Sequence, residues 1–484
     1  MFVLILKLET GQYQEDVLDK RFEIARKMYN ALLGKVYKRY NEMIKTKQWR
    51  NLTQEIKAAI NEIERKKIYK VRNQLIKENR LSEYDFHADI KLMQHKFKQN
   101  IDSYTAQKIA TRVWTAMEDL LFDNGEKLHF KKYGGVQSVE GKSNGTGIRF
   151  IENRLIWLDL DIKVSIDPNN PYEIMALEKK IKFCRIKRKF IKGAYKYYIQ
   201  LILDGVRPAK IDKKTGEFKK NTQGDVGLDI GTQTLAISSN QEVKLIELAP
   251  SINNISRNIK QLQRYLDRSR RANNLDNFND DGTIKKGIKL TWNKSKRYQK
   301  AQSQLKELHR KQADQRRYDH WQVVNYLESL GDNFYIEQMN FKALQKRSKN
   351  TEKNDKGKFK RKKRFGKSLA NKAPSMFVTM LKSRNIVNEI NTREVKASQY
   401  NHLDQNYNKK KLSQRWNYMI YNGQEIKVQR DLYSAYLIQN TNDDLKTTNQ
   451  EKCELSFDLF LTLHQKEVDR LNENSLRTAV KNVI

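Results

Sequence analysis

The chain of 484 residues is long enough to bury several hydrophobic cores. Lys and Arg number 95 against 57 Asp and Glu, which gives a formal net charge of +38. A compact protein with this charge repels itself unless it has an anionic partner. Nucleic acid is the partner we expect, because each neutralised phosphate releases condensed counterions. A lysine-rich surface that is merely solvated is the alternative.

Cysteine usage and hydropathy indicate the compartment. Cys184 and Cys453 lie in different predicted domains, so no disulfide framework is expected and a reducing compartment fits. The N-terminal apolar run has no basic region before it and no small-residue cleavage site after it, unlike a signal peptide. No apolar run approaches the ~20 residues that span a bilayer. We therefore expect a soluble cytoplasmic protein with no membrane partner.

The first half of the chain predicts two structural regions. Residues 1–10 have the composition of a strand, and residues 11–126 show apolar side chains at three- and four-residue steps, which is typical of helices; within them, 54–80 is predicted as one charged amphipathic helix. Residues 127–206 alternate polar with β-branched and aromatic residues, which predicts a small β-barrel that the first strand completes. The polar segment 207–224 is predicted to be a linker and the main domain boundary.

From residue 225 the pattern predicts an α/β domain. Three consecutive strands, VGLDIGT, TLAISSN and VKLIELA, precede two basic helices at about 252–273 and 288–330. A strand around Glu337, a helix at about 374–388 and a short strand TREVKAS follow, and helices after Cys453 are expected to pack back on the domain. Three meandering strands and a fourth reached through helices are an RNase H-like order.

Three carboxylates stand inside these elements. Asp229 lies in VGLDIGTQTLA, Glu337 in FYIEQMNF and Asp431 in VQRDLYSAYLI. Taken singly, Asp229 could be a strand-end cap, and Asp431 could be a first-turn residue favoured by the helix dipole. Glu337 interrupts an apolar strand, where a buried carboxylate without a cation is costly. Three such oxygen ligands on rigid elements can bind two divalent ions at a phosphodiester.

The three motifs, in this order, resemble the RuvC motifs of the transposon-encoded TnpB nucleases and of the small type V CRISPR (Cas12-like) effectors. FKKYGGVQSV resembles a segment of that family's barrel. The resemblance implies a multidomain α+β fold: a helical recognition lobe inserted in a wedge-type β-barrel, then a RuvC nuclease domain in two parts, 225–397 and 429–484. It also implies an RNA-guided DNA endonuclease, monomeric or homodimeric, whose partners are guide RNA and double-stranded target DNA. Asp229, Glu337 and Asp431 would then be catalytic and hold two Mg²⁺ ions, for which Mn²⁺ can substitute.

The chain departs from the family in two places. Relatives have a four-cysteine zinc ribbon where this chain has residues 398–428, which contain no cysteine and only His402 as a soft ligand. One histidine cannot build a structural zinc site, so we expect no zinc, His402 as a polar loop side chain, and a loop around Trp416 and Tyr418. Gln338 and Tyr433 replace the usual Asp and Asn of the motifs, but neither is a predicted metal ligand.

Cations and rings predict where nucleic acid binds. The strand 182–189 alternates basic and apolar residues, the two long helices are basic, and 346–367 holds 12 Lys or Arg in 22 residues. A charge-protected edge strand, exposed charged helices and a solvated tether are the alternatives. The predicted contacts are Lys131, Lys132, Tyr133, Arg185, Lys187, Lys189, Arg264, Arg268, Arg271, Arg297, Lys362, Lys363 and Arg364.

Two other functions are compatible with these motifs. One is an RNA-guided DNA-binding repressor without cleavage, although nuclease-dead relatives lose catalytic carboxylates and this chain keeps all three. The other is an RNase H-like transposase, but the sequence contains no separate helix-turn-helix module for binding transposon ends.

Overall fold

A computed structural model of the chain describes residues 1–122, 125–209, 211, 222–345, 366–409 and 414–481, with side chains up to 473. The fold mixes α-helices and β-sheets. The chain divides into two compact units, residues 1–219 and 220–484, each with its own hydrophobic core. The division falls inside the segment 207–224. None of the described helices is long and apolar enough to cross a membrane.

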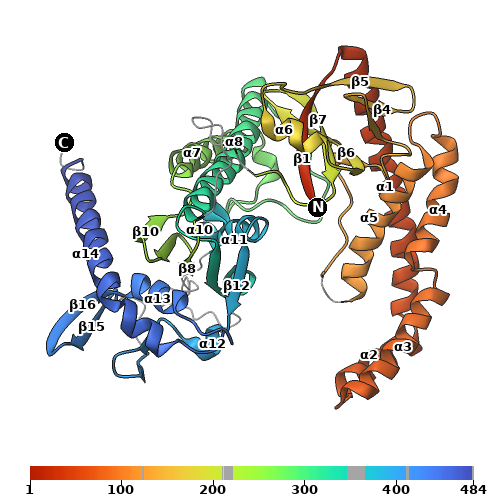
Figure 1. Cartoon of the computed structure of the whole chain (residues 1–484). Helices are drawn as coiled ribbons and strands as arrows, with labels where there is room; N and C mark the ends of the chain where they lie inside the picture. Colours follow the sequence, from red (N-terminus) through yellow and green to blue (C-terminus); the bar gives the residue numbers. More distant parts are fainter. Residues whose placement is uncertain (123–124, 210, 212–221, 346–365, 410–413, 482–484) are drawn as a thin grey trace. The chain divides into compact units, whose positions relative to one another are not determined.

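The first unit begins with a strand and five helices. Their bounds are β1 Phe2–Glu9, α1 Gln12–Ile44, α2 Lys47–Ala58, α3 Glu62–Glu78, α4 Glu83–Lys96 and α5 Ser103–Leu121. The single helix predicted over 54–80 is wrong, because Asn61 ends the run by capping α3: its side chain accepts a hydrogen bond from the Glu64 N–H. Helices α1, α4 and α5 lie side by side (Figure 1).

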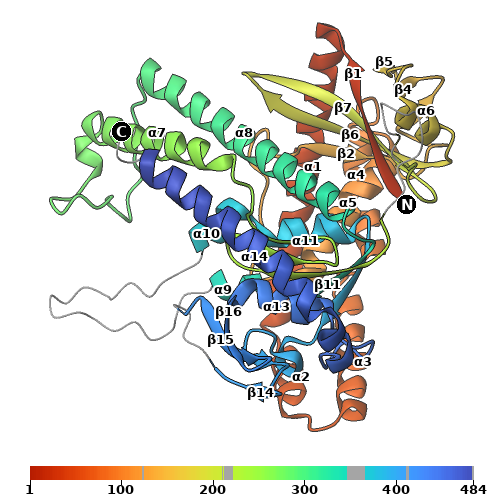
Figure 2. The same cartoon turned by 60° about the vertical axis from the view of Figure 1, so that its left-hand side comes forward.

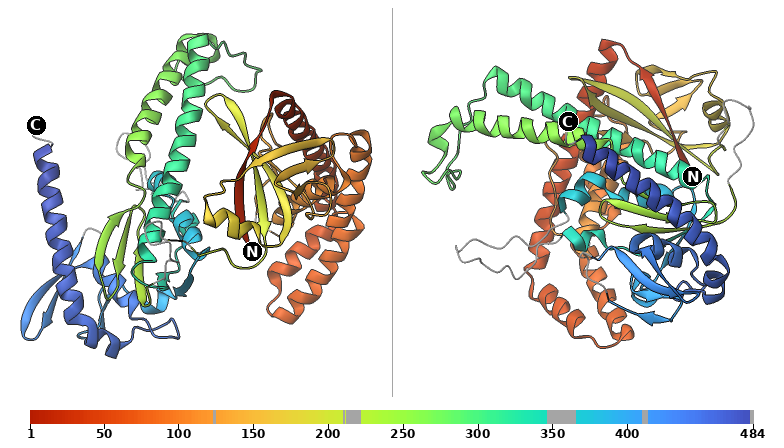
Figure 3. Two further views of the ribbon diagram at one scale, coloured as in Figure 1. Left: turned by 45° about the horizontal axis from the view of Figure 1, so that its top comes forward. Right: turned by 90° about the vertical axis from the view of Figure 1, so that its left-hand side faces the viewer.

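A seven-stranded antiparallel sheet completes this unit. Its order is β2-β6-β7-β1-β5-β4-β3, so β1 lies between β7 and β5 as Figure 3 shows. Strand β6 approaches the edge strand β3 at Asn144, whose N–H donates to the Lys182 carbonyl oxygen on β6 and whose side chain pairs with the Phe150 backbone on β3. The bounds are β2 Ser138–Glu140, β3 Arg149–Ile151, β4 Arg154–Trp157, β5 Leu160–Ser165, α6 Pro171–Leu177, β6 Ile181–Ile191 and β7 Ala194–Leu203.

The second unit is built on a five-stranded sheet of order β10-β9-β8-β11-β12. Its strands are β8 Asp225–Ile230, β9 Thr234–Ser238, β10 Val243–Glu247, β11 Asn333–Glu337 and β12 Ile386–Ile390. The first three form an antiparallel meander, and β11 and β12 run parallel to β8. The meander followed by a strand reached through helices agrees with the order expected from the sequence.

The fifth strand is not the one predicted. TREVKAS contains the short helix α12 Thr392–Val395 instead, and the strand is β12. The helix α11 Pro374–Lys382 ends before the predicted position of about 388, and β12 begins at Ile386. Polar side chains on β12 obscure the strand pattern, because the Asn388 amide donates to Asn333 Oδ1 across the sheet at 2.7 Å. A strand held partly by such a side-chain ladder lacks the apolar alternation that identifies strands.

Helices cover both faces of this sheet. On one face, Leu228 and Ile336 pack with Val324 of α8 and Phe377 of α11, and on the other face lie α13 and α14. Helices α7 and α8 lie side by side along their length (Figure 2). The remaining bounds are α7 Ile252–Ala272, a 3-10 turn Leu275–Asn277, α8 Lys296–Leu327, α9 Phe341–Gln345, α10 Gly366–Lys372, α13 Arg430–Gln439 and α14 Gln450–Lys481.

Residues 398–428 form two β-hairpins rather than the predicted loop around Trp416 and Tyr418. Strands β13 Tyr400–Asn401 and β14 Asn406–Tyr407 form the first, and β15 Trp416–Tyr421 and β16 Gln424–Gln429 form the second. The residues that anchor the second hairpin are Met419 and Val428, which are buried, whereas Tyr418 is 59% exposed. Met419 is buried in place of the neighbouring Tyr418 because successive side chains along a strand face opposite sides.

Candidate active site

The strand register brings Asp229 and Glu337 together. Strands β8 and β11 are parallel and pair Leu228 with Ile336, so the next residue of each strand is a carboxylate. Leu228 and Ile336 are buried in the core on one face of the sheet. Side chains alternate along a strand, and both carboxylates therefore point to the opposite face.

Helix α13 brings the third carboxylate to that face. A Cβ on Gly227 would lie 2.1 Å from the Ala435 carbonyl oxygen and 2.4 Å from the Gln439 nitrogen, so the helix backbone lies directly against β8. Gln429 caps the helix by accepting a hydrogen bond from the Leu432 N–H, which places Asp431 in the first turn. The sequence analysis missed Gly227, although glycine inside a strand commonly marks such a close backbone approach.

The three carboxylates line one cavity of about 560 Å³. All three side chains are half-buried. The cavity also has polar and basic walls, which include Thr232, Gln233, Gln399, Lys409, Arg415 and Arg430. Two strands and one helix, which are separated by about a hundred residues each in sequence, thus converge on a single space that is large enough for a phosphate group.

Burial and mutual repulsion disfavour negative charge in this cavity. The pKa of Asp229 is raised well above its ordinary value by burial, and further by the carboxylates of Glu337 and Asp431. The positive charge of Arg430 lowers this pKa, but by less. Burial raises the pKa of Glu337 to about 7. Clustered carboxylates with raised pKa values are typical of catalytic and metal-binding sites, because a cation is needed to hold them ionised.

Two arginines bind Asp431. Arg430 Nη2 donates to Oδ1 at 2.9 Å and Arg415 Nη1 donates to Oδ2 at 3.2 Å. The sequence analysis missed both. Arg430 adjoins Asp431 in the motif, whereas Arg415 precedes β15, is brought opposite Arg430 by the β15–β16 hairpin, and leaves no local pattern.

The donor set fits a hard divalent cation, because three carboxylates on rigid elements converge and two of them, Asp229 and Glu337, have no ion-pair partner among the described residues. The side chains are not prearranged for it. Within the described ranges, no group of three or more His, Cys, Asp or Glu side chains is placed to hold a metal ion. Asp431 would have to exchange its arginines for the cation.

The raised pKa of Glu337 predicts how stability depends on pH without metal. The folded protein favours the protonated acid, so the contribution of Glu337 to the free energy of unfolding should fall as pH rises from about 4.5 to about 7. A pKa raised from 4.5 to about 7 corresponds to about 3 kcal/mol. The pKa of Asp229 is also raised, so Glu337→Gln should weaken this pH dependence in urea unfolding with EDTA without removing it, and exposed Glu425→Gln should keep it in full. An unchanged pH dependence in Glu337→Gln would contradict the assignment.

A cluster of aromatic side chains packs against helix α13, which carries Asp431. His402 is fully buried, which corrects the expectation of a polar loop side chain. Its Nδ1 lies 2.6 Å from the Tyr433 hydroxyl, and its ring lies edge-on to Phe457 at 4.6 Å. Tyr436 and Phe460 stack at 4.4 Å in the same cluster. The β13–β14 hairpin, α13 and α14 are therefore joined by ring packing two residues from Asp431.

The residues of the first unit that were predicted to contact nucleic acid differ in exposure and in ion pairing. Lys131, Lys132 and Tyr133 are exposed, Tyr133 by 85%. On β6, Arg185, Lys187 and Lys189 are half-buried on one side of the strand, opposite buried Cys184, Ile186 and Arg188. Arg185 pairs with Glu140 at 2.5 Å, so its charge is already partly neutralised. Basic residue Arg188 is unexpectedly in the core, where Asp19 and Glu23 compensate it.

The contacts predicted in the second unit lie on the two long helices. Arg264, Arg268 and Arg297 are exposed, and Arg271 is exposed but pairs with Asp267 at 3.1 Å. Lys362, Lys363 and Arg364 lie outside the described residues, as does nearly all of 346–367.

Comparisons with known proteins add a structural likeness only. No protein-family model and no curated protein sequence matches the chain. Among solved structures, the chain is similar to a cryo-EM structure of a Cas12f1–sgRNA–target DNA complex, at 11% identity and a TM-score of 0.43, over 90% of this chain and 84% of that one. It is also similar to a CRISPR–Cas12f ternary complex, at 12% identity and a TM-score of 0.26, over 90% and 83%. Neither TM-score reaches 0.5, so the function has to be argued from the site.

Proposed function

We propose that this protein is an RNA-guided DNA endonuclease of the TnpB and small type V CRISPR kind. The observation that carries the proposal is the convergence of Asp229, Glu337 and Asp431 on one cavity, from two parallel strands and a helix. The strand order of the second unit supports an RNase H-like RuvC domain. In the first unit, the seven-stranded sheet and helices α1–α5 support a wedge barrel with a recognition lobe, and the hairpins of 398–428 would be a degenerate zinc ribbon.

In this proposal Asp229, Glu337 and Asp431 hold divalent magnesium, which when bound stabilises the attacking and leaving oxygens of the phosphodiester. The protein's own contribution is positional. Strands β8 and β11 fix two carboxylates at neighbouring register positions, and the Gly227 contact fixes the start of α13. Arg415 and Arg430 hold Asp431 at the cavity wall and would lie beside the phosphate once it enters.

Charge and sequence resemblance support the nucleic-acid partners. A net charge of +38 suits a guide RNA and a DNA duplex, whose phosphates would neutralise the exposed cations of the barrel and of α7 and α8. All three carboxylates are present, which favours cleavage over a repressor that binds without cutting. Sequencing the RNA that co-purifies with the protein, and then assaying Mg²⁺-dependent cleavage of complementary DNA, tests the proposal directly.

Guide RNA should stabilise the protein strongly. The self-repulsion of a +38 chain is relieved by polyphosphate, and a ligand that binds only the folded state stabilises it by mass action. Repulsion is least screened at low salt, so we expect the RNA-free protein to be least stable there, and its thermal midpoint to rise when the co-purified RNA is restored. The affinity for RNA should fall steeply with salt. A plot of the logarithm of the association constant against the logarithm of the salt concentration should have a slope of several negative units, since each phosphate contact contributes about −0.7 to −0.9. A slope near one, or a midpoint that no RNA moves, would contradict the proposal.

A further inference from the structure

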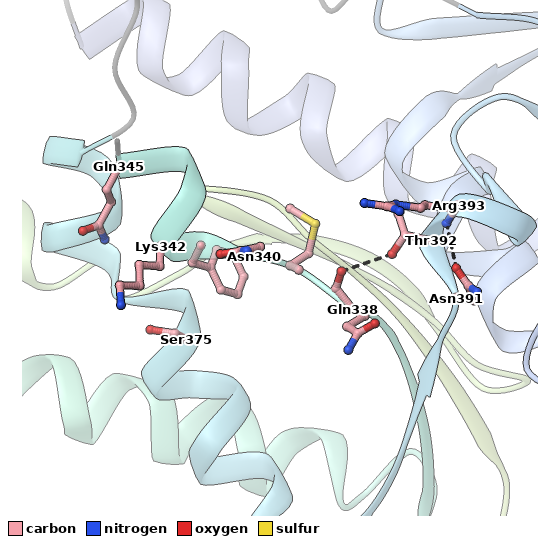
Figure 4. Close-up of a pocket in the computed structure, with 10 residues that line it drawn as sticks. Gln338, Asn340, Lys342, Gln345, Ser375, Asn391, Thr392 and Arg393 are labelled. Atoms are coloured by element: carbon pink, nitrogen blue, oxygen red, sulfur yellow. Dashed lines mark hydrogen bonds between the residues drawn. The ribbon is translucent and has the colours of Figure 1, made fainter. Parts of the chain in front are cut away.

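A second cavity of about 1020 Å³ adjoins the carboxylate cavity in the same unit, and Met339 lines both. The segment after Glu337, the start of α11 and the segment after β12 form its walls. Figure 4 shows Lys342, Gln345 and Ser375 on one side, Thr392 and Arg393 on the other, and Asn340 and Gln338 between them. The cavity therefore continues from the site along a wall that mixes polar and apolar side chains.

The lining is rich in cations and amides and contains no acid. Its charged side chains are Lys342 and Arg393, and neither makes an ion pair or hydrogen bond with any residue that the structure describes. The amides of Gln338 and Gln345 are likewise without a described partner, whereas the Asn391 amide donates to Glu394 at 2.8 Å. Two cations without a described ion-pair partner, beside the amides of Gln338 and Gln345, can donate hydrogen bonds to a ligand. Such a surface is complementary to an anion.

Phe341 adds one aromatic ring to the lining. Cations that contact the backbone together with a ring on which a base stacks are the usual means of binding single-stranded nucleic acid. The volume lies at the top of the range of small-molecule pockets, about 300–1,000 Å³, so the cavity has room for more than a single phosphate.

We propose that this cavity binds the DNA strand next to the phosphodiester that is cut. Lys342 and Arg393, from opposite sides, would contact phosphates, and Phe341 would stack on a base. The inference rests on the proposed function, because it takes the substrate as the occupant. The shared Met339 wall favours a strand that passes from one cavity into the other over a free anion that binds this cavity alone.

Photo-crosslinking tests this assignment without any cleavage. The full-length protein with its co-purified RNA is incubated in EDTA with single-stranded oligodeoxythymidylate in which 5-iododeoxyuridine replaces thymidine, and cross-linked residues are mapped by mass spectrometry. We expect cross-links at Phe341 or Met339. The double variant Lys342→Ala/Arg393→Ala should reduce them by about tenfold or more, as the loss of charge-assisted contacts predicts. Because both side chains are exposed and lack described partners, this variant should melt like wild type.

The matched control is Lys452→Ala, which removes an exposed lysine of α14 outside the cavity lining and should leave cross-linking at Phe341 unchanged. Cross-links that map only elsewhere, or equal yields in the double variant and the control, would overturn the assignment. So would loss of cross-linking when equimolar thymidine monophosphate is added, because a free nucleotide would then be the occupant. If Asp229→Asn stops cleavage while the double variant cross-links normally, the proposed function stands and only this inference fails.

Discussion

Replacing Asp229, Glu337 or Asp431 by alanine should abolish DNA cleavage while binding of guide RNA and target DNA stays nearly unchanged. The three side chains line one cavity, and each would hold metal that stabilises charge at the phosphodiester. A loss of several kcal/mol of transition-state stabilisation corresponds to about a thousandfold or more in rate. Binding should persist because it rests on phosphate contacts and base pairing. Single-turnover cleavage with Mg²⁺, and electrophoretic mobility shifts in EDTA, measure the two quantities separately.

The matched control for this series is Asp225→Asn. Asp225 lies four residues before Asp229 on the same strand and face, and its carboxylate accepts a hydrogen bond from the Asn333 amide at 2.7 Å, outside the cavity lining. Its variant should cleave at close to the wild-type rate. Cleavage within about tenfold of wild type for any of the three alanine variants would remove that residue from the proposed metal site, since tenfold is only about 1.4 kcal/mol.

Gly227→Ala should unfold or severely loosen the second unit, and with it the site. The added methyl group would lie 2.1 Å from the Ala435 carbonyl oxygen, where real Cβ atoms are not found, so α13 must move away from β8. The backbone of α13 cannot rotate out of the contact as a flexible side chain can. Overpacking of this kind lowers the free energy of unfolding by about 1–3 kcal/mol or more. We expect a lower thermal midpoint and loss of cleavage together, because Asp431 moves with the helix.

Gly366→Ala provides the comparison, because a Cβ at that position in the same unit would meet no described atom within 4 Å. Its thermal midpoint should match that of wild type. A Gly227→Ala protein with an unchanged midpoint in differential scanning calorimetry would show that α13 does not press on β8, and the placement of Asp431 would then need another explanation.

The carboxylates could be found from the sequence because each interrupts a short, strongly patterned element. Asp229 and Glu337 follow buried residues in strands, and Asp431 opens an apolar helix, so local pattern predicts both the element and the exposed position. Their convergence follows from the strand order. Arg415 could not be found this way, because it meets Asp431 only after the β15–β16 hairpin folds back. That contact is set by a turn rather than by the local pattern.

In other parts of the fold, the hydrophobic pattern of the sequence does not predict the secondary structure. The helix predicted over 54–80 is two helices, because one capping residue, Asn61, outweighs a continuous charged amphipathic pattern. Strand β12 carries Asn388 and Glu389 among its apolar residues, so hydrophobic alternation could not identify it. In each case an asparagine hydrogen bond accompanies the departure from the predicted pattern, and such a bond leaves little trace in the hydropathy of the sequence.

The ring cluster around His402 has a consequence for the conditions in which the protein can fold. Its hairpin is joined to α13 and α14 by Tyr433, Phe457 and neighbouring rings, and such packing needs no ion from the environment. Stabilisation by apolar burial depends on temperature and cosolvents, and a chelator or a shortage of trace metal leaves it untouched. Apolar burial weakens on cooling, so cold is a stress that should loosen this hairpin region beside Asp431.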